Sequence, residues 1–185
     1  MMPTPVMAEV ARPVLRHQAQ WSTERDGAPP MLAGFVQSDF SPLLAAAADR
    51  CLSEHYAKPP MPPESRQRTA LLLVSGSGDR VSAEHVRRTV ADGRRLGPLF
   101  FFQSVPNSVL GQIASHWGLG GPVLCISPIG EPLTDGMAQA ALLIDDGDAD
   151  EVLLLLVEQT EPPAGAEHSG TDIAHALLLS KGETE

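Results

Sequence analysis

Two unbroken apolar runs constrain the fold of this chain more than any other feature of its sequence. Residues 69–74 read TALLLV and residues 151–158 read EVLLLLVE. A short run that is apolar at nearly every position and is closed by turn residues is typical of a β-strand covered on both faces. Stretches with helical spacing of apolar residues lie between the two runs. The pattern therefore predicts crossover units, an α/β fold and a mostly parallel sheet between helices.

Proline and glycine divide the rest of the chain into further elements. A helix is expected to begin at Ser41, with Pro42 in its first turn, and to end before Pro59. Val109, Leu110, Ile113 and Trp117 share one face of a second helix that Gly118 ends, and two more helices are expected over residues 82–93 and 133–147.

The remaining strands complete a five-stranded sheet. Strands are expected over residues 121–127 and 172–180, and one more near residues 7–15, within an otherwise irregular segment 1–34. No helix separates the last two strands, so they can run antiparallel. Residues 35–185 are then one domain with a mixed five-stranded sheet and helices on both faces. Its one interruption is residues 58–65, KPPMPPES, expected to be a stiff surface connector.

The charge balance and the cysteine count exclude several classes of protein. The chain has 13 Lys and Arg against 23 Asp and Glu, a net charge of −10, which argues against binding to nucleic acid or to an anionic membrane. No apolar run approaches the length of a membrane span, and the first residues lack the basic start of a secretory signal, so a cytoplasmic protein is expected. Cys51 and Cys125 fit neither a disulfide framework nor a zinc site.

Local motifs supply no catalytic constellation, cofactor site or metal site. The turn SGSGD at residues 75–79 has two glycines of a dinucleotide fingerprint, but Val81 occupies the third glycine position, so an ordinary turn is favoured over a phosphate site. Cys125 is expected to be buried in its strand and unreactive. The histidines are isolated from one another in the sequence; they include His85, His116, His168 and His175.

Arginines concentrate in one short stretch of this acidic chain. They are Arg80, Arg87, Arg88, Arg94 and Arg95. Such a cluster can receive an acidic partner or a phosphate-bearing arm through charge-assisted contacts. The alternative is a solvated helix surface balanced by Asp79, Glu84 and Asp92, and it is favoured over a partner site.

Residues 96–158 resemble the amino-terminal half of β-ketoacyl synthases, condensing enzymes of thiolase fold. The segment GPLFFFQSVPNSVLGQIASHWGLGGP is similar to the family's Gly-Pro, Phe, Ser, Pro-Asn, helix and Gly-x-x-Gly-Pro series. AALLIDDGDADEVLLLLVE is similar to its Ala-rich helix, its Gly-x-x-Asp turn and a strand ending in Glu158. The resemblance implies one thiolase-type half. It also implies that the strand over residues 121–127 pairs across a dimer axis.

The resemblance places a glycine where the family has its nucleophile. Counted from Gly121-Pro122, the nucleophilic Cys of the family falls on Gly130, in SPIGEPLTDG, and Cys125 lies five residues too early. The family also takes two catalytic His from its carboxy-terminal half, and residues that match that half are missing from this sequence. A glycine has no side chain for covalent catalysis, so condensation by this chain alone is not expected.

The leading hypothesis is therefore a non-catalytic accessory or structural subunit of polyketide or fatty-acid biosynthesis. Its expected partners are a second copy, a full-length ketosynthase, or an acyl carrier protein bound at the arginines. Phe100, Phe101, Phe102, Ser104 and Asn107 are candidates for an acyl tunnel or a dimer contact. One alternative is an acyl-thioester-processing enzyme with a composite or atypical site, using Ser104, Asn107 or His116; another is a small-molecule-binding α/β domain that shares only the fold.

Overall fold

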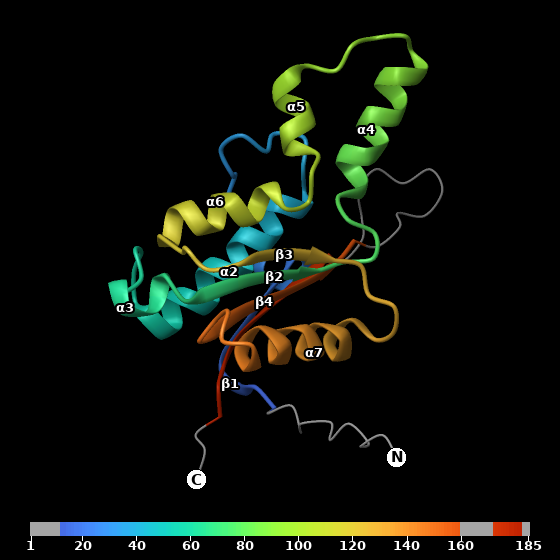
Figure 1. Ribbon diagram of the computed structural model, residues 1–185. Coiled ribbons are helices and arrows are strands. Elements are labelled where there is room, and N and C mark those ends of the chain that lie inside the picture. The colour runs from blue at the N-terminus through green and yellow to red at the C-terminus, as the bar shows by residue number, and fades with distance from the viewer. Residues whose placement is uncertain (1–11, 160–171, 183–185) are drawn as a thin grey trace, which may run out of the picture.

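The computed structural model describes residues 12–159 and 172–182, which form one five-stranded sheet with helices on both faces (Figure 1). The strand order is β1-β5-β4-β2-β3. The strands are β1 (Val14–Ser22), β2 (Thr69–Val74), β3 (Val123–Ile126), β4 (Glu151–Glu158) and β5 (Ile173–Ser180). The helices are α1 (Thr23–Asp26), α2 (Phe40–Tyr56), α3 (Pro63–Arg66), α4 (Arg80–Ala91), α5 (Pro98–Gln103), α6 (Ser108–Trp117) and α7 (Pro132–Asp145).

The strand pairings confirm the mixed sheet and correct the expectation that it is mostly parallel. β2 pairs in parallel with β3 and with β4, whereas β5 pairs antiparallel with both β4 and β1. The antiparallel β4–β5 pair is the one that the sequence predicts. The second antiparallel pair arises because β1 adds to the far side of β5, a long-range pairing that leaves no local signal in the sequence.

Helices α2 and α6 cover one face of the sheet with the larger of the two hydrophobic clusters. Phe40 and Leu44 of α2 and Trp117 of α6 are fully or almost fully buried there, against Leu73 and Leu155 of the sheet. The run of leucine and alanine in α2 favours a helix, and it presents residues at helical spacing to the strands. Gly118 ends α6 in the left-handed conformation, as the sequence predicts.

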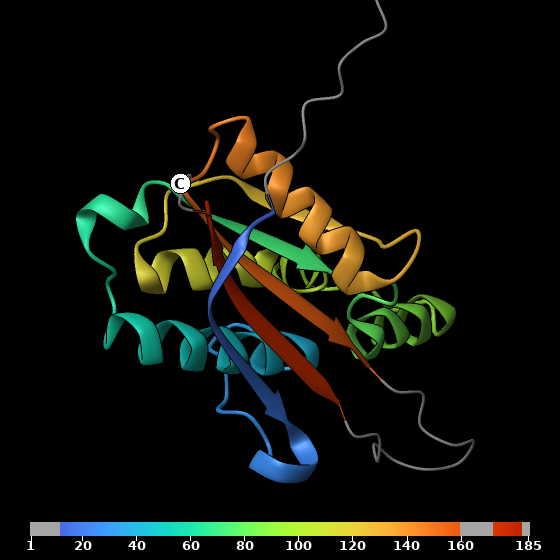
Figure 2. The same cartoon turned by 90° about the horizontal axis from the view of Figure 1, so that it is seen from below.

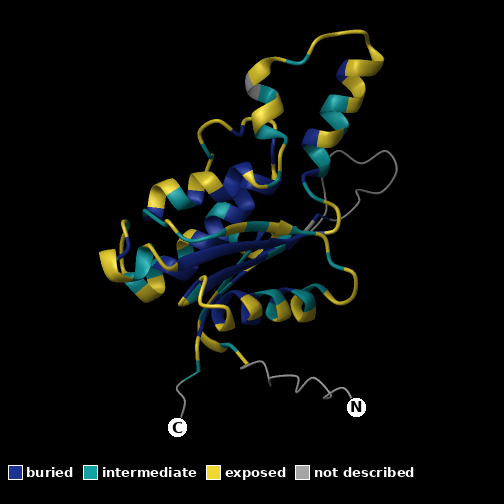
Figure 3. Ribbon diagram, viewed as in Figure 1, coloured by how far each residue is buried: buried dark blue, intermediate teal, exposed yellow. Residues whose placement is uncertain are grey.

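Among the described residues, helix α7 alone covers the opposite face, where it lies over β4 and β2 (Figures 1 and 2). A Cβ atom at Gly136 would stand 2.8 Å from a methyl carbon of Leu154 and 3.2 Å from one of Val74. Glycine at this position therefore lets the helix approach the sheet closely. The burial colours of Figure 3 show α7 buried on its sheet side and exposed on its outer side.

Helices α4 and α5 form an arm that extends away from the sheet (Figure 1). Only Ser82 and Thr89 of α4 are buried. Asp79 caps α4 and accepts hydrogen bonds from the backbone amide and the hydroxyl of Ser82 at 2.9 and 2.8 Å. In the turn after β2, the backbone amides of Ser75, Gly78 and Arg80 donate hydrogen bonds to acceptors of this chain.

Three sequence-based expectations about local structure are wrong. The first strand spans residues 14–22, not 7–15, and residues 7–11 lie outside the described part of the chain. The connector over residues 58–65 is not merely a surface spacer. Met61 within it is 1% exposed and donates a backbone hydrogen bond to Trp117, and the helix α3 begins at Pro63.

Strand β3 provides the third correction, because it is an edge strand with alternating burial rather than a buried one. Cys125 is exposed, and partial desolvation of its thiol raises its pKa. Cys51 of α2 is the buried thiol, and burial raises its pKa to about 12. Among the described residues, no helix is long and apolar enough to span a membrane.

Candidate functional site

The turn between β3 and α7 holds Gly130, the position that the resemblance equates with the family's nucleophile. Ile129 is completely exposed and Gly130 is exposed. The backbone amides of these two residues both point to one carboxylate oxygen of Asp135, Oδ2, at 2.7 and 2.8 Å. Two adjacent amides that converge on one point can hold an anion, and here the chain supplies that anion itself.

Glu131 accepts hydrogen bonds from two further backbone amides, at the start of α7. Its carboxylate accepts hydrogen bonds from the backbone amides of Leu133 and Thr134 at 3.1 and 2.7 Å, and from the Thr134 hydroxyl at 2.9 Å. These bonds hold the pKa of Glu131 below its usual range. The carboxylates of Glu131 and Asp135 therefore accept hydrogen bonds from the backbone amides at and just before the amino end of α7. Pro132 has no amide hydrogen to donate there.

Gly130 has room for a side chain. A Cβ atom there would stand 3.6 Å from Oδ1 of Asp135, an ordinary contact distance, and its backbone φ lies outside the left-handed region. Local geometry would thus admit a cysteine, but the sulfur would face a carboxylate. A nearby negative charge disfavours the thiolate form that a nucleophile needs. Asp135 is the residue that sequence reasoning missed, because its role depends on the turn folding back onto the helix.

The arginine cluster lies on and after α4, where three of its five arginines pair with two carboxylates of the chain. Arg87 and Arg88 bind Glu84 at 2.6 and 2.5 Å, and Arg94 binds Asp92 at 2.8 Å. The hydrogen bonds from Arg87 and Arg88 lower the pKa of Glu84 to about 2. Arg80 donates its backbone amide to Gln159, and Arg95 is exposed.

Two of the three candidate phenylalanines are exposed on the arm. Phe101 and Phe102 are 72% and 63% exposed, and the ring of Phe100 packs 4.6 Å from that of His85. The Ser104 hydroxyl donates to the carbonyl of Phe101 at 2.9 Å. Asn107 precedes α6 without a side-chain capping bond. The arm therefore exposes an aromatic surface formed by Phe101 and Phe102.

The isolated histidines do not assemble into a site. His116 is exposed beside Asp49, at 3.6 Å, and His175 is exposed on β5 with a pKa lowered by partial desolvation. His168 lies outside the described residues. No cluster of three or more His, Cys, Asp or Glu side chains that could hold a metal occurs in residues 12–159 and 172–182.

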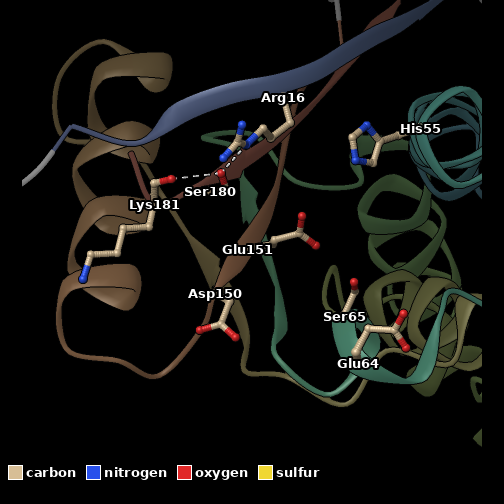
Figure 4. A pocket seen from close by; sticks show the side chains of 8 residues that line it. All are labelled: Arg16, His55, Glu64, Ser65, Asp150, Glu151, Ser180 and Lys181. Atoms are coloured by element: carbon tan, nitrogen blue, oxygen red, sulfur yellow. Dashed lines mark hydrogen bonds between the residues drawn. The ribbon is translucent and has the colours of Figure 1, made fainter. Parts of the chain in front are cut away.

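A hollow of about 490 Å³ opens at the other end of the sheet, near the start of β4 (Figure 4). Its lining carries both signs of charge, from Arg16 and Lys181 and from Glu151 and Asp150. Several of these charged groups have partners within the chain: Arg16 donates a hydrogen bond to the Ser180 hydroxyl, and Asp150 forms an ion pair with Arg68. The hydroxyl of Tyr56 donates to Glu151, and burial with this bond raises the pKa of Tyr56.

Comparison with known families decides where the chain belongs. The sequence profile of the β-ketoacyl synthase N-terminal domain matches residues 38–185. The chain belongs to this family. The match covers α2, the arm, the turn with Gly130 and the β4–β5 pair, so it contains the segments on which the sequence resemblance rests.

Solved structures of similar fold are ketosynthases and chain length factors. A ketosynthase in complex with its chain length factor from Xenorhabdus doucetiae superposes with a TM-score of 0.62 at 22% identity, over 83% of this chain and 61% of that one. The ishigamide ketosynthase/chain length factor gives 0.63 at 16% identity, over 88% and 48%. A β-ketoacyl synthase from Burkholderia phymatum gives 0.56 at 16% identity, over 83% and 47%.

These comparisons confirm the thiolase-like half that the sequence predicts. The chain spans between about half and three fifths of the length of these structures. At such low identity they establish the fold of this chain and nothing about its chemistry. No curated protein matches the sequence.

Proposed function

We propose that this protein is a non-catalytic ketosynthase-like subunit of polyketide or fatty-acid biosynthesis. The turn before α7 carries the proposal. Gly130 supplies no nucleophile, and Asp135 accepts hydrogen bonds from both amides of that turn. Covalent acyl transfer needs a nucleophile and donors free to hold a developing oxyanion, and this turn supplies neither.

The proposed partner is a full-length ketosynthase, and its proposed contact is the free edge of β3. Val123 is 47% exposed and Cys125 is exposed on this edge strand. An edge strand presents unpaired backbone groups that another strand can satisfy. Two of the similar structures pair a ketosynthase with a chain length factor, which supports a heteromeric role of this kind for this chain.

An acyl carrier protein is a second proposed partner. One similar structure is a complex of a carrier protein with its ketosynthase. The arginines of the arm would have to exchange Glu84 and Asp92 for carboxylates of the carrier, so the net gain in charge pairing is small. Reversing the charge of Arg87, Arg88, Arg94 and Arg95 tests this contact: capture of the carrier that survives the reversal overturns it.

The decisive experiment for the ketosynthase partner combines co-expression with cysteine protection. The chain is co-purified with ketosynthases encoded beside its gene, and the mass of the complex is measured by light scattering. Alkylation of Cys125 by iodoacetamide is expected to slow at least tenfold in the complex, while buried Cys51 stays unmodified in both states. Absence of a complex, or a complex in which Cys125 reacts at its free rate, overturns the proposed interface.

The same preparation separates the subunit from the composite-enzyme alternative. If the chain completes an active site, changing Ser104, Asn107 or His116 to alanine abolishes product formation by an intact complex. If it is a non-catalytic subunit, these changes leave product formation within twofold. Val90→Glu, a change at a 63% exposed position of the arm, controls for general effects of surface substitution.

A further inference from the structure

The hollow near the start of β4 lies at the opposite end of the sheet from the turn with Gly130. That turn follows the carboxyl end of β3, whereas Glu151 is the first residue of β4, and β3, β2 and β4 run in the same direction. The hollow has a volume of about 490 Å³, and its lining comes from β1, α2, α3 and the β4–β5 pair. Whatever it binds is therefore independent of the function proposed above.

Glu151 is a half-buried carboxylate that the chain holds in place but does not neutralise. The Tyr56 hydroxyl donates a hydrogen bond to its Oε2 atom at 2.5 Å, and the Thr69 hydroxyl lies 3.2 Å from the same oxygen. Within residues 12–159 and 172–182, Oε1 accepts no hydrogen bond and no basic side chain forms an ion pair with Glu151. Tyr56 ends α2, so the negative end of a 17-residue helix lies beside this carboxylate. A partly buried group in such surroundings is stabilised by a cation.

Arg16 supplies a positive charge to the same hollow. Its Nε atom donates a hydrogen bond to the Ser180 hydroxyl at 2.5 Å, which leaves its two terminal nitrogens as further donors. Ser180 lies directly opposite Glu151 in the β4–β5 register, a separation of about 5 Å between Cα atoms. No ion pair joins Arg16 to Glu151 or to another carboxylate in the described part of the chain. In Figure 4 the Lys181 ammonium group points away from Glu151.

An unpaired carboxylate and an unpaired guanidinium in one hollow are complementary to a ligand that carries both signs of charge. A simple cation would be attracted by Glu151 and repelled by Arg16, and a simple anion would meet the reverse. An α-amino acid carries its ammonium and carboxylate groups on a single carbon, so one small molecule reaches both partners. The ring of His55 and the hydroxyl of Ser65 also line the hollow and offer polar contacts to its side chain (Figure 4).

We propose that this hollow binds a free α-amino acid with a polar side chain. The ammonium group of the ligand donates to Oε1 of Glu151, and its carboxylate accepts from the terminal nitrogens of Arg16. Its side chain lies toward His55 and Ser65. The hydrogen bonds that hold Glu151 and Arg16 are made within the chain, so both charged groups are in position before the ligand arrives.

Thermal denaturation of the purified full chain with each standard L-α-amino acid tests the proposal. At a concentration of about 10 mM, at least one amino acid with a polar side chain is expected to raise the melting temperature, because it binds the folded state alone. Isothermal titration calorimetry then gives its dissociation constant. The methyl ester and the N-acetyl derivative of that amino acid each lack one charge. Both are expected to bind at least about tenfold more weakly.

Two variants connect this binding to the named side chains. Arg16→Gln and Glu151→Gln are each expected to raise the dissociation constant at least about tenfold, and glutamine at position 151 can still accept the hydrogen bond from Tyr56. Arg25→Gln and Glu24→Gln, on α1 at the other end of β1, are the matched controls and are expected to bind as the unmodified chain does. Arg16 is exposed, so its variant still decides the question if Glu151→Gln does not fold by circular dichroism.

Three results would overturn the proposal. The first is that no amino acid stabilises the chain or binds to it. The second is binding that Arg16→Gln and Glu151→Gln leave unchanged. The third is that the methyl ester or the N-acetyl derivative binds as tightly as the amino acid, which would mean a site for a single charge.

Discussion

The two faces of the sheet are covered to different extents. The face under α2 and α6 holds the aromatic core, with Phe40 and Trp117 fully or almost fully buried. In the described part of the chain, the face under α7 is covered by one helix and has no aromatic residue in its cluster. Both clusters share the same strands, so the difference lies in what covers them. We infer that the α2 and α6 face provides most of the stability.

The largest expected effect comes from the well-covered face. Trp117→Ala removes a side chain that is 1% exposed and belongs to the larger cluster, and it is expected to lower the free energy of unfolding by about 3–5 kcal/mol. Urea denaturation followed by circular dichroism measures the change. Leu142→Ala, on the outer side of α7, is the matched control and is expected to cost the monomer less than about 1 kcal/mol. Equal losses in the two variants would contradict the comparison.

The contact between α7 and the sheet is the next test. Gly136→Ala places a methyl group 2.8 Å from Leu154, and it is expected to destabilise the protein by about 1–3 kcal/mol through overpacking. In contrast, Gly111→Ala in α6 has open space around the new methyl group, and it is expected to stabilise by up to about 1 kcal/mol through helix propensity. The same denaturation curves compare the two. A neutral Gly136→Ala would mean that α7 is held less closely than described.

A smaller effect concerns the closed turn before α7. In Gly130→Cys the new thiol faces the Asp135 carboxylate, which should raise the thiol pKa and slow alkylation at neutral pH. Adding Asp135→Asn is expected to speed alkylation about fivefold, which corresponds to ~1 kcal/mol. The pH dependence of iodoacetamide labelling of the new thiol, measured against Cys125, gives both pKa values. Identical rates in the single and double variants would show that Asp135 exerts no such control.

The smallest effect lies on the arm. Arg87 and Arg88 lower the pKa of Glu84 to about 2. The stability that the charged Glu84 carboxylate gives α4 is therefore fully present above the ordinary pKa near 4.5 and is lost as the pH falls through 2. NMR titration of the Glu84 carboxyl group is expected to show this low midpoint, with amide protection in α4 falling over the same range. Glu84→Gln should remove the pH dependence of that protection. A midpoint near 4.5 would mean that the ion pairs are absent in solution.

The sequence predicts the parts of the fold that local pattern decides. β2, β4 and α6 are predicted at or within a residue of their observed bounds, because their apolar residues report burial directly. The pairing of β1 with β5 and the edge position of β3 depend on partners far along the chain, and the sequence misses both. β3 is apolar enough to suggest a buried strand, yet its place at the sheet edge leaves Cys125 exposed.

The candidate site is likewise predicted where a local count along the sequence is enough, and it is missed where the folded contact decides. The resemblance locates Gly130, since that requires only an ungapped count from Gly121-Pro122. It gives no indication that Asp135 would accept hydrogen bonds from the amides of Ile129 and Gly130, because that contact requires the three-dimensional turn. The arginines are likewise predicted as a group, but their in-chain pairs with Glu84 and Asp92 depend on the conformation of α4 and the residues after it.

The pairing of β1 with β5 has a consequence for how the chain acquires its structure. Val14 lies opposite Ser180 and Ser22 opposite Ile173, so the first strand of the sheet to be synthesised pairs with the last one. Contacts between residues so far apart in sequence form late, because closing so long a loop is entropically unfavourable. During synthesis on the ribosome, β1 therefore has no strand to pair with until β5 has left the exit tunnel.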